Sequence, residues 1–371
     1  MPNNETRKNE ATWIESRQRW QIKVQRDGER RAFTSTILGK KGKAEAERQA
    51  DKWLEVKYNK DIRFEKLWEM FLEDTKNHKK SGSSANYVQH EKMGRLWILP
   101  YIKKTKRLST LTTDDYQAGI DAAAKAGKSR RTCVNIRASL TAVYGFARKK
   151  KYRMEPPEFL VIPENAPTKE RRILQPDDLK ILFSTDAIMH YNKERPCWYI
   201  HAWRFLVVTG LRRGELCGLE RADREDNILY IRRSVNSLGE TTQGKTKNAQ
   251  RCFVLNRHAQ RILSQQEDML KAAGIISPYL FPDEHGDRTD PNRLYDKWAT
   301  YRKQHGISSS LHEMRHTMIS IAKVDAPEEL LKAAVGHSKN MNTFSVYGHT
   351  VDGEMQRLAD ILDEAYDKVL E

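Results

Sequence analysis

The chain has 371 residues, of which 38% are hydrophobic and 9% aromatic, so it is long enough for two or three domains and too apolar to be disordered. Its net charge of +16 is uneven: Lys and Arg outnumber Asp and Glu by 14 to 9 in residues 1–57, by 23 to 13 in 58–170 and by 29 to 28 in 171–371. A basic half joined to a nearly neutral half favours a nucleic-acid partner, although Lys and Arg also serve solubility.

The N-terminal residues predict a small sheet with one helix. Residues 19–26 (RWQIKVQR) alternate apolar and polar side chains, which is typical of a half-buried strand. Asp27-Gly28 favours a hairpin turn, and 29–38 (ERRAFTSTIL) is the expected returning strand. Residues 43–58 have the periodicity of an amphipathic helix. We therefore expect a separate domain over residues 1–58.

A helical domain is expected over residues 59–155. Helical periodicity marks residues 64–75, 84–99 and 129–152, and SGSS at 81–84 favours a turn between the first two helices. The third helix is strongly basic, which is typical of a solvated face or of phosphate contacts. Its candidate DNA-contacting residues are Arg130, Arg131, Arg137, Lys149 and Lys150.

The second half of the chain begins after a proline-rich segment. Four of the twelve prolines lie in residues 155–170, so 156–170 is expected to be a linker between domains. A helix is expected to start at Pro176. The domain over 171–371 should be mostly helical, with one hairpin formed by 227–234 and 251–256.

Four stretches of this second half stand out. TGLRRGELCGL (209–219) places Arg212 at a helix start, where backbone amides also bind anions. GKTK (244–247) places lysines at the hairpin tip, LHEMRH (311–316) holds His312 and Arg315, and VGHSKNMNTFSVYGH (335–349) holds His337 and Tyr347.

LHEMRH also fits the H-E-x-x-H pattern of zinc metalloproteases. Helical spacing would place His312 and His316 on one face to share a metal, with Glu313 as general base. The extended H-E-x-x-H-x-x-G-x-x-H form is absent, and Arg315 would bring a fixed cation close to the metal. A protease would also leave Tyr347 and the basic half unexplained, so this alternative is disfavoured.

In this order, the four stretches resemble the tyrosine recombinase family, in particular the integrases of phages and conjugative transposons. The resemblance covers the whole chain and is most specific over 209–219 and 311–349. It implies a multidomain, mainly α fold with small β elements. The expected parts are an arm-site-binding module with a three-stranded sheet and a helix, a helical core-binding domain, and a mainly α catalytic domain.

The resemblance makes Tyr347 the nucleophile that attacks a DNA phosphodiester, giving a 3′-phosphotyrosyl link and a free 5′-hydroxyl. Arg212 and Arg315 would hold the non-bridging oxygens, on which charge grows in the transition state. The covalent link conserves the bond energy, so neither ATP nor a metal or other cofactor is expected.

The remaining roles also follow from the resemblance. His312 would accept a proton or bind the phosphate, and His337 would donate a hydrogen bond to it. Lys245 is the expected general acid for the departing 5′-oxygen. Lys247 is the alternative, because the turn length leaves the register of the hairpin tip open, and it is also a candidate for DNA contact.

The predicted function is site-specific integration and excision of a mobile element. A DNA-binding regulator that lost catalysis is the alternative from another class, and the intact set of predicted catalytic residues argues against it. A topoisomerase would share this chemistry and differs through the arm-type module. The implied partners are double-stranded DNA with core and arm-type sites, excisionase and DNA-bending proteins. No membrane is involved, and the location is the bacterial cytoplasm, at the nucleoid.

The last residues, 353–371, form an apolar helical stripe that must be buried somewhere. The resemblance favours packing of this tail on a neighbouring protomer in a DNA-bound homotetramer. The alternative is that the helix folds back on its own domain.

Overall fold

The computed structural model describes residues 9–26, 29–54, 61–79, 83–168, 172–191, 193–242, 251–336 and 353–371. The chain divides into two compact units, one of residues 1–74 and 90–168 and one of residues 75–89 and 169–371. Buried apolar side chains form three clusters within these units. Within the described part, no helix is long and apolar enough to cross a membrane.

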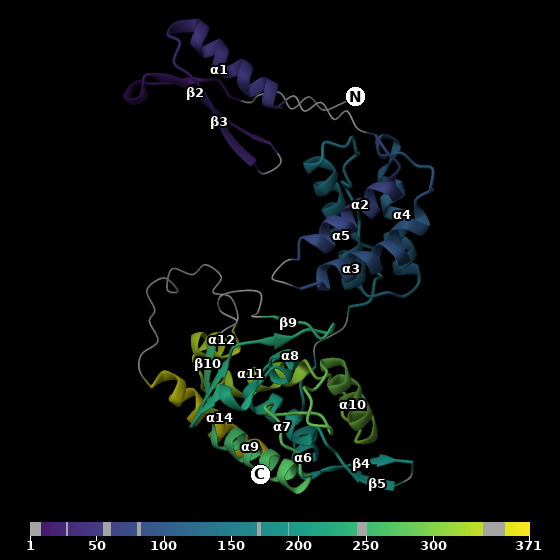
Figure 1. The fold of residues 1–371 in the computed structure, drawn as a ribbon, viewed down its shortest axis with the longest axis vertical. Helices are drawn as coiled ribbons and strands as arrows, with labels where there is room; N and C mark the ends of the chain where they lie inside the picture. The colour runs from purple at the N-terminus through teal and green to yellow at the C-terminus, as the bar shows by residue number, and fades with distance from the viewer. Residues whose placement is uncertain are drawn as a thin grey trace. The chain divides into compact units, whose positions relative to one another are not determined.

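The N-terminal cluster joins a three-stranded antiparallel sheet to one helix. The sheet has the order β1 (Thr12–Ile14), β2 (Arg19–Arg26), β3 (Glu29–Ser35), and α1 (Gly39–Leu54) covers one face (Figure 1). The predicted strand and helix are confirmed, although the returning strand ends at Ser35 rather than residue 38. Gly39, whose φ of +69° suits glycine, begins the helix earlier than predicted.

The second cluster belongs to four helices. They are α2 (Phe64–Asn77), α3 (Ala85–Met93), α4 (Thr113–Lys125) and α5 (Arg130–Lys149). The sequence did not predict α4, whose start is fixed by a capping box between Thr112 and Asp115. The segment predicted as a linker contributes the buried side chains of Leu160, Ile162 and Ala166 to this cluster, so this part of it packs on the helical domain.

The third and largest cluster surrounds α7. The helices that contribute to this cluster are α6 (Pro176–Ser184), α7 (Ile200–Thr209), α8 (Arg213–Cys217), α9 (Arg257–Ala272), α10 (Pro291–Gln304), α11 (Glu313–Ala322), α12 (Glu328–Val335) and α14 (Glu354–Leu370). All ten residues of α7 are buried, and α6, α8, α9 and α11 pack on this central helix. The helix predicted to start at Pro176 is confirmed as α6.

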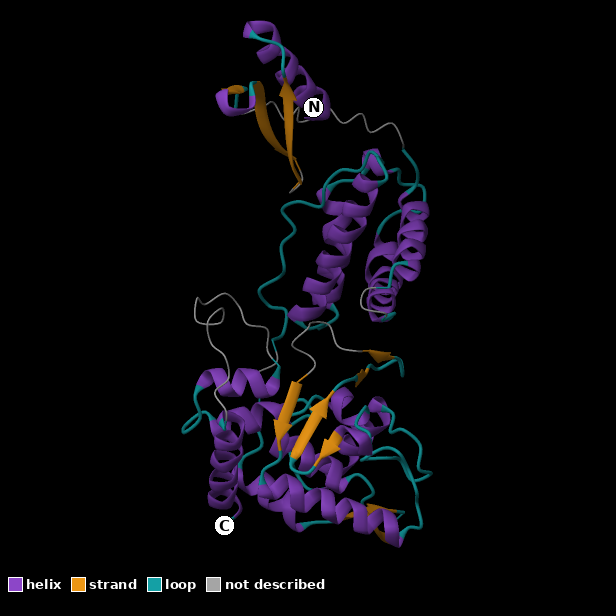
Figure 2. Ribbon diagram, turned by 60° about the vertical axis from the view of Figure 1, so that its left-hand side comes forward, coloured by secondary structure: helices purple, strands orange, loops and turns teal. Residues whose placement is uncertain are grey.

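Small sheets complete this region. The strands are β4 (Ala187–His190), β5 (Lys193–Pro196), β6 (Arg224–Glu225), β7 (Ile228–Ile231), β8 (Ser234–Val235), β9 (Thr241–Thr242) and β10 (Arg251–Val254). The predicted pairing of 227–234 with 251–256 is confirmed: β10 and β7 are antiparallel, and β6 adds a third strand (Figure 2). The β4–β5 hairpin was not predicted.

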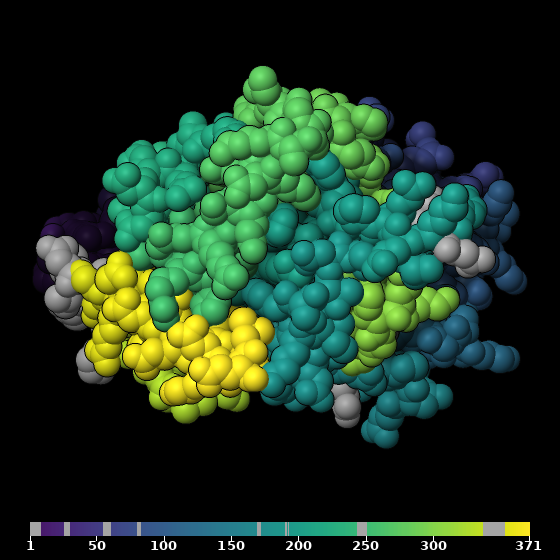
Figure 3. All heavy atoms as spheres, turned by 90° about the horizontal axis from the view of Figure 1, so that it is seen from below, coloured from purple at the N-terminus to yellow at the C-terminus, as the bar shows by residue number. Residues whose placement is uncertain are grey.

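In the single chain that the structure describes, the tail helix packs on its own domain, which is the alternative to the predicted packing on a neighbouring protomer. Helix α14 contacts α6, α9, α11, α12 and β10, and its yellow surface lies against the green α9 (Figure 3). Leu358, Leu362 and Tyr366 are at most 1% exposed. The apolar stripe is therefore buried within the chain, where it packs against the cluster around α7.

Candidate active site

Arg212 is placed by the turn between α7 and α8. Gly210 ends α7 with a φ of +64°, a left-handed backbone conformation that favours glycine, whereas the atom nearest to an added Cβ is only the movable end of the Met318 side chain. The turn sets Arg212 directly before α8, as the sequence predicted. Its backbone amide donates to Glu215 Oε2 at 2.9 Å, which fixes the start of the helix.

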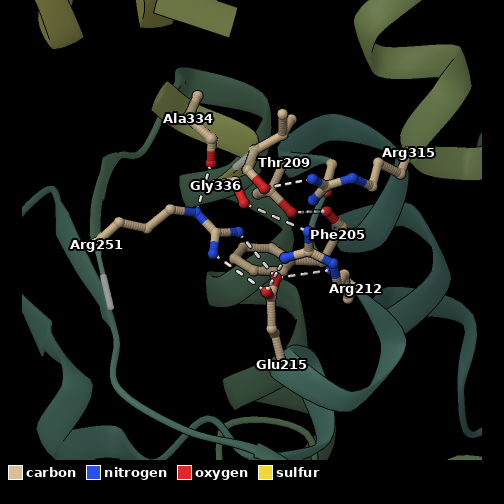
Figure 4. A network of polar contacts seen from close by, with 10 residues as sticks. Phe205, Thr209, Arg212, Glu215, Arg251, Arg315, Ala334 and Gly336 are labelled. Atoms are coloured by element: carbon tan, nitrogen blue, oxygen red, sulfur yellow. Dashed lines mark hydrogen bonds and ion pairs between the residues drawn. The ribbon is translucent and has the colours of Figure 1, made fainter. Parts of the chain in front are cut away.

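Glu215 is the acidic centre of the site (Figure 4). Its buried carboxylate accepts Arg212 Nη1 at 2.7 Å and Arg251 Nη1 and Nη2 at 3.1 and 2.8 Å. Burial raises the pKa of Glu215, but the hydrogen bonds and charge of Arg251, followed by those of Arg212, outweigh burial and hold it below the ordinary value. The carboxylate is therefore ionised at neutral pH and pairs with two guanidinium groups.

Arg315 is the deepest of the three arginines, with 2% of its surface exposed. From α11, its Nη1 donates to Gly210 O at 2.9 Å and its Nη2 donates to Val335 O. Burial, followed by repulsion from Arg212, lowers the pKa of Arg315 to about 9. The guanidinium remains a cation at neutral pH, and an anion bound beside it would stabilise its charge.

The three arginines meet at the end of α12. Arg251 Nε donates to Ala334 O at 2.6 Å, Arg315 donates to Val335 O, and Arg212 Nη2 lies 3.5 Å from Gly336 O (Figure 4). These are consecutive carbonyls of a helix C-terminus, which lack intrahelical partners and carry partial negative charge. The end of α12 and Glu215 thus hold three guanidinium groups side by side despite their repulsion.

The glutamate of the H-E-x-x-H segment is engaged by backbone amides. The Glu313 carboxylate accepts the backbone amides of Ser310 and Arg172, so it caps the start of α11. The rings of His312 and His316 lie edge to face with centroids 5.2 Å apart. Among the described residues, no group of three or more His, Cys, Asp or Glu side chains could hold a metal ion.

Two tyrosines other than Tyr347 are locked in the core. Tyr366 donates its hydroxyl to Val207 O at 2.6 Å, and Tyr301 donates to Thr185 O at 2.9 Å. Burial raises the pKa of each phenol above its ordinary value. Neither hydroxyl can reach a DNA phosphate, because both are enclosed by the protein.

The structure brings together two of the predicted catalytic residues, Arg212 and Arg315, and places His312 directly before the helix of Arg315. Four predicted residues lie outside the described part of the chain: Lys245, Lys247, His337 and Tyr347. The predicted DNA-contacting residues of the helical region are Arg130, Arg131, Arg137, Lys149 and Lys150, all of which are exposed on α5 or at its end.

Sequence reasoning missed Arg251 and the role of Glu215. Glu215 stands in the quoted TGLRRGE segment, and its spacing of three residues from Arg212 could have suggested a helix-start pair. Arg251 is the first residue after a polar loop, where a basic side chain is usually solvent-exposed. Its burial follows from the register of β10 against β7 and from the approach of α12, whose Ala334 O it contacts, and no local pattern reveals either.

Residues 173–354 match the model of the phage integrase family. These residues therefore carry a domain of this family. The chain is 24% identical over 282 residues to the prophage integrase IntR of Escherichia coli (strain K12), a match that covers 69% of this chain. The chain spans 65% of the length of that relative, just under two thirds.

Two solved structures share the fold of this chain. One is the Tn1549 transposon integrase in complex with transposon right end DNA, with a TM-score of 0.60 and 19% identity over 79% of this chain and 98% of that one. The other is a lambda integrase tetramer bound to a Holliday junction, with a TM-score of 0.60 and 15% identity over 93% and 99%. The predicted fold class, multidomain and mainly helical with small sheets, is thereby confirmed.

Proposed function

We propose that this protein is an integrase, a site-specific DNA recombinase that cuts and rejoins DNA through a covalent 3′-phosphotyrosyl intermediate. The observation that carries the proposal is the convergence of Arg212 and Arg315, from different elements, on the neighbouring carbonyls of Gly336 and Val335. Two adjacent guanidinium groups fit the two non-bridging oxygens of a phosphodiester. The family and the order of the four motifs support the same activity.

In the proposed reaction, the Tyr347 oxygen attacks the phosphorus as its proton passes to His312 or to the phosphate. The bond from phosphorus to the 5′-oxygen breaks, and Lys245, or Lys247, protonates that oxygen. Arg212 and Arg315 stabilise the charge that grows on the non-bridging oxygens, and buried guanidinium groups do so more strongly than groups in water. Attack of a new 5′-hydroxyl on the phosphotyrosine reverses these steps and joins the strands.

DNA binding is proposed for the domains of the basic half. Residues 59–155 would hold the core site, with the exposed basic side chains of α5 on the phosphates. Residues 1–58 would bind arm-type sites, with 156–170 between the helical and catalytic domains. The open face of the N-terminal sheet carries polar and basic side chains, among them Lys23 and Arg30, because α1 covers the other face.

The biological setting is a further part of the proposal. The relatives are a prophage integrase and a transposon integrase, so the substrate would be a mobile element that is integrated and excised in the bacterial cytoplasm, at the nucleoid. Lambda integrase forms a tetramer on a Holliday junction, and the same assembly is proposed here. Excisionase and DNA-bending proteins would be the accessory partners.

The test is to incubate the protein with fragmented genomic DNA, denature it, and sequence the DNA 3′ ends that stay attached to protein. The proposal expects ends at a few defined sequences. Tyr347→Phe is the matched control, because it removes one hydroxyl and should bind DNA without forming the adduct. Absence of any protein-linked 3′ end from the wild type, under conditions in which it binds DNA, would contradict the proposed chemistry.

A further inference from the structure

Arg251 is the third guanidinium of the site, and the proposed reaction gives it no task. Its side chain is 7% exposed, nearly as buried as that of Glu215 at 4%. Nη1 and Nη2 donate to the two Glu215 oxygens and Nε donates to Ala334 O. Every nitrogen of this guanidinium therefore has a partner inside the protein. A group held in this way is suited to support the site rather than to contact DNA.

The Glu215 carboxylate is divided between two arginines. Oε1 accepts Nη1 of Arg212 and Nη1 of Arg251, while Oε2 accepts Nη2 of Arg251 and the backbone amide of Arg212. Four hydrogen bonds fill the acceptor positions of a carboxylate. Arg212 thus donates only one of its side-chain nitrogens to Glu215. The Arg212 side chain is 39% exposed and stays accessible.

Loss of Arg251 would change this division. Two acceptor positions of a buried, ionised carboxylate would become vacant, and the cost of leaving them unfilled is high. Arg212 is already bound to the same carboxylate, and guanidinium and carboxylate groups prefer a two-point contact. Arg212 would therefore turn towards Glu215 and give it donors that a phosphate needs.

We propose that Arg251 is a positioning residue that satisfies Glu215 and the end of α12, so that Arg212 keeps donors available for the substrate phosphate. The inference rests on the proposed function, because it assigns the phosphate to Arg212. A purely structural ion pair would also hold β10 to α8. The two roles differ in one respect. Once Arg251 is gone, the charge of Glu215 lowers stability in either case, but only the positioning role makes that charge lower the rate at which the folded protein forms the adduct.

The experiment compares Arg251→Met with the double variant Arg251→Met/Glu215→Gln, using the covalent adduct on DNA. Met keeps an unbranched side chain, and Gln removes the charge that would capture Arg212. Adduct formation should fall by about 10- to 100-fold in Arg251→Met, with little change in DNA affinity. The double variant should recover at least about tenfold of that loss.

Arg204→Met is the matched control. Arg204 is as buried as Arg251, with 5% of its side chain exposed, and it lies in the same unit. It donates hydrogen bonds to Leu182 O and Asp186, and neither residue belongs to the site formed by Arg212, Arg251 and Arg315. This variant should lose stability, while its folded fraction forms the adduct at the wild-type rate.

Inorganic phosphate gives a second readout that needs no strand cleavage. Compared with chloride at equal ionic strength, it should raise the Tm of the wild type more than that of Arg212→Ala. Exclusion of phosphate from protein surfaces in general raises the Tm of every variant alike. The excess of the wild type over Arg212→Ala therefore reports binding of phosphate at the site. Arg251→Met should lose the excess and the double variant should regain it. If Arg251→Met fails to fold, Arg251→Lys replaces it, because Lys keeps one cation but cannot contact both Glu215 and Ala334 O.

The outcomes separate the two claims. If the wild type forms no adduct but the phosphate pattern holds, the proposed function is wrong and the positioning role stands. If Arg251→Met matches the wild type in both readouts, the positioning role is overturned. It is also overturned if the double variant is no better than Arg251→Met, or if the wild type shows no phosphate excess over Arg212→Ala.

Discussion

Leu362→Ala in α14 tests whether this helix packs on its own domain, as in the structure, or on a neighbouring protomer, as predicted from the sequence. Leu362 has no exposed surface and belongs to the cluster around α7. The substitution removes three carbon atoms, which at about 0.8 kcal/mol each lose about 2.4 kcal/mol of transfer free energy. The remaining cavity raises the expected loss in the free energy of unfolding to about 3–4 kcal/mol.

The assay is urea unfolding of the full chain, with the transition of the C-terminal region assigned by hydrogen exchange. Glu364→Ala, at an exposed position of the same helix, is the control and should change the free energy of unfolding by less than about 0.5 kcal/mol. Packing within the chain makes the Leu362→Ala loss independent of protein concentration. A loss that appears only at high protein concentration would refute this reasoning, because it would show that α14 packs on another copy.

Four further predictions concern the site and the domains. Arg212→Lys should lower the rate of adduct formation by about 10²-fold or more, measured on trapped DNA, because an ammonium group cannot bind Glu215 and a phosphate oxygen with a planar fork. EDTA should leave adduct formation unchanged; loss of activity that zinc restores would revive a metal role for the LHEMRH segment. A protein beginning near residue 60 should keep core-site binding and lose arm-site binding in gel-shift assays, and retained arm-site binding would refute the role of residues 1–58. The lowered pKa of Glu215 stabilises the fold at pH above its ordinary value of 4.5, and this contribution is lost as pH falls towards the folded-state pKa, so Glu215→Gln should flatten the acid-side fall of Tm.

The sequence predicted those parts of the fold that rest on local patterns. The alternation in 19–26, the start at Pro176 and the apolar stripe of the tail each depend on residues close together in the chain. Helix α4 was missed because its capping signal, Thr112 with Asp115, is followed by a weakly amphipathic, alanine-rich stretch. The partner of the tail could not be predicted, because a stripe shows that a helix must be buried but not what buries it.

The candidate site divides in the same way. Arg212 and Arg315 stand in motifs whose order is specific, so the sequence could identify them. The place of Arg251 could not be predicted, because it depends on the register of β10 against β7, in which Arg251 faces Ile231. The joint contact of three arginines with the end of α12 involves residues more than one hundred positions apart, as between Arg212 and Gly336, and only the folded chain brings these together.

The most direct test of the central claim is to find which residue carries the DNA. The protein is trapped on cleaved DNA, digested with nuclease and protease, and the nucleotide-bearing peptide is sequenced by mass spectrometry. The account predicts one modified residue, Tyr347, joined through its phenolic oxygen to a 3′-phosphate. A nucleotide on any other residue, or a 5′-phosphate linkage, would contradict it.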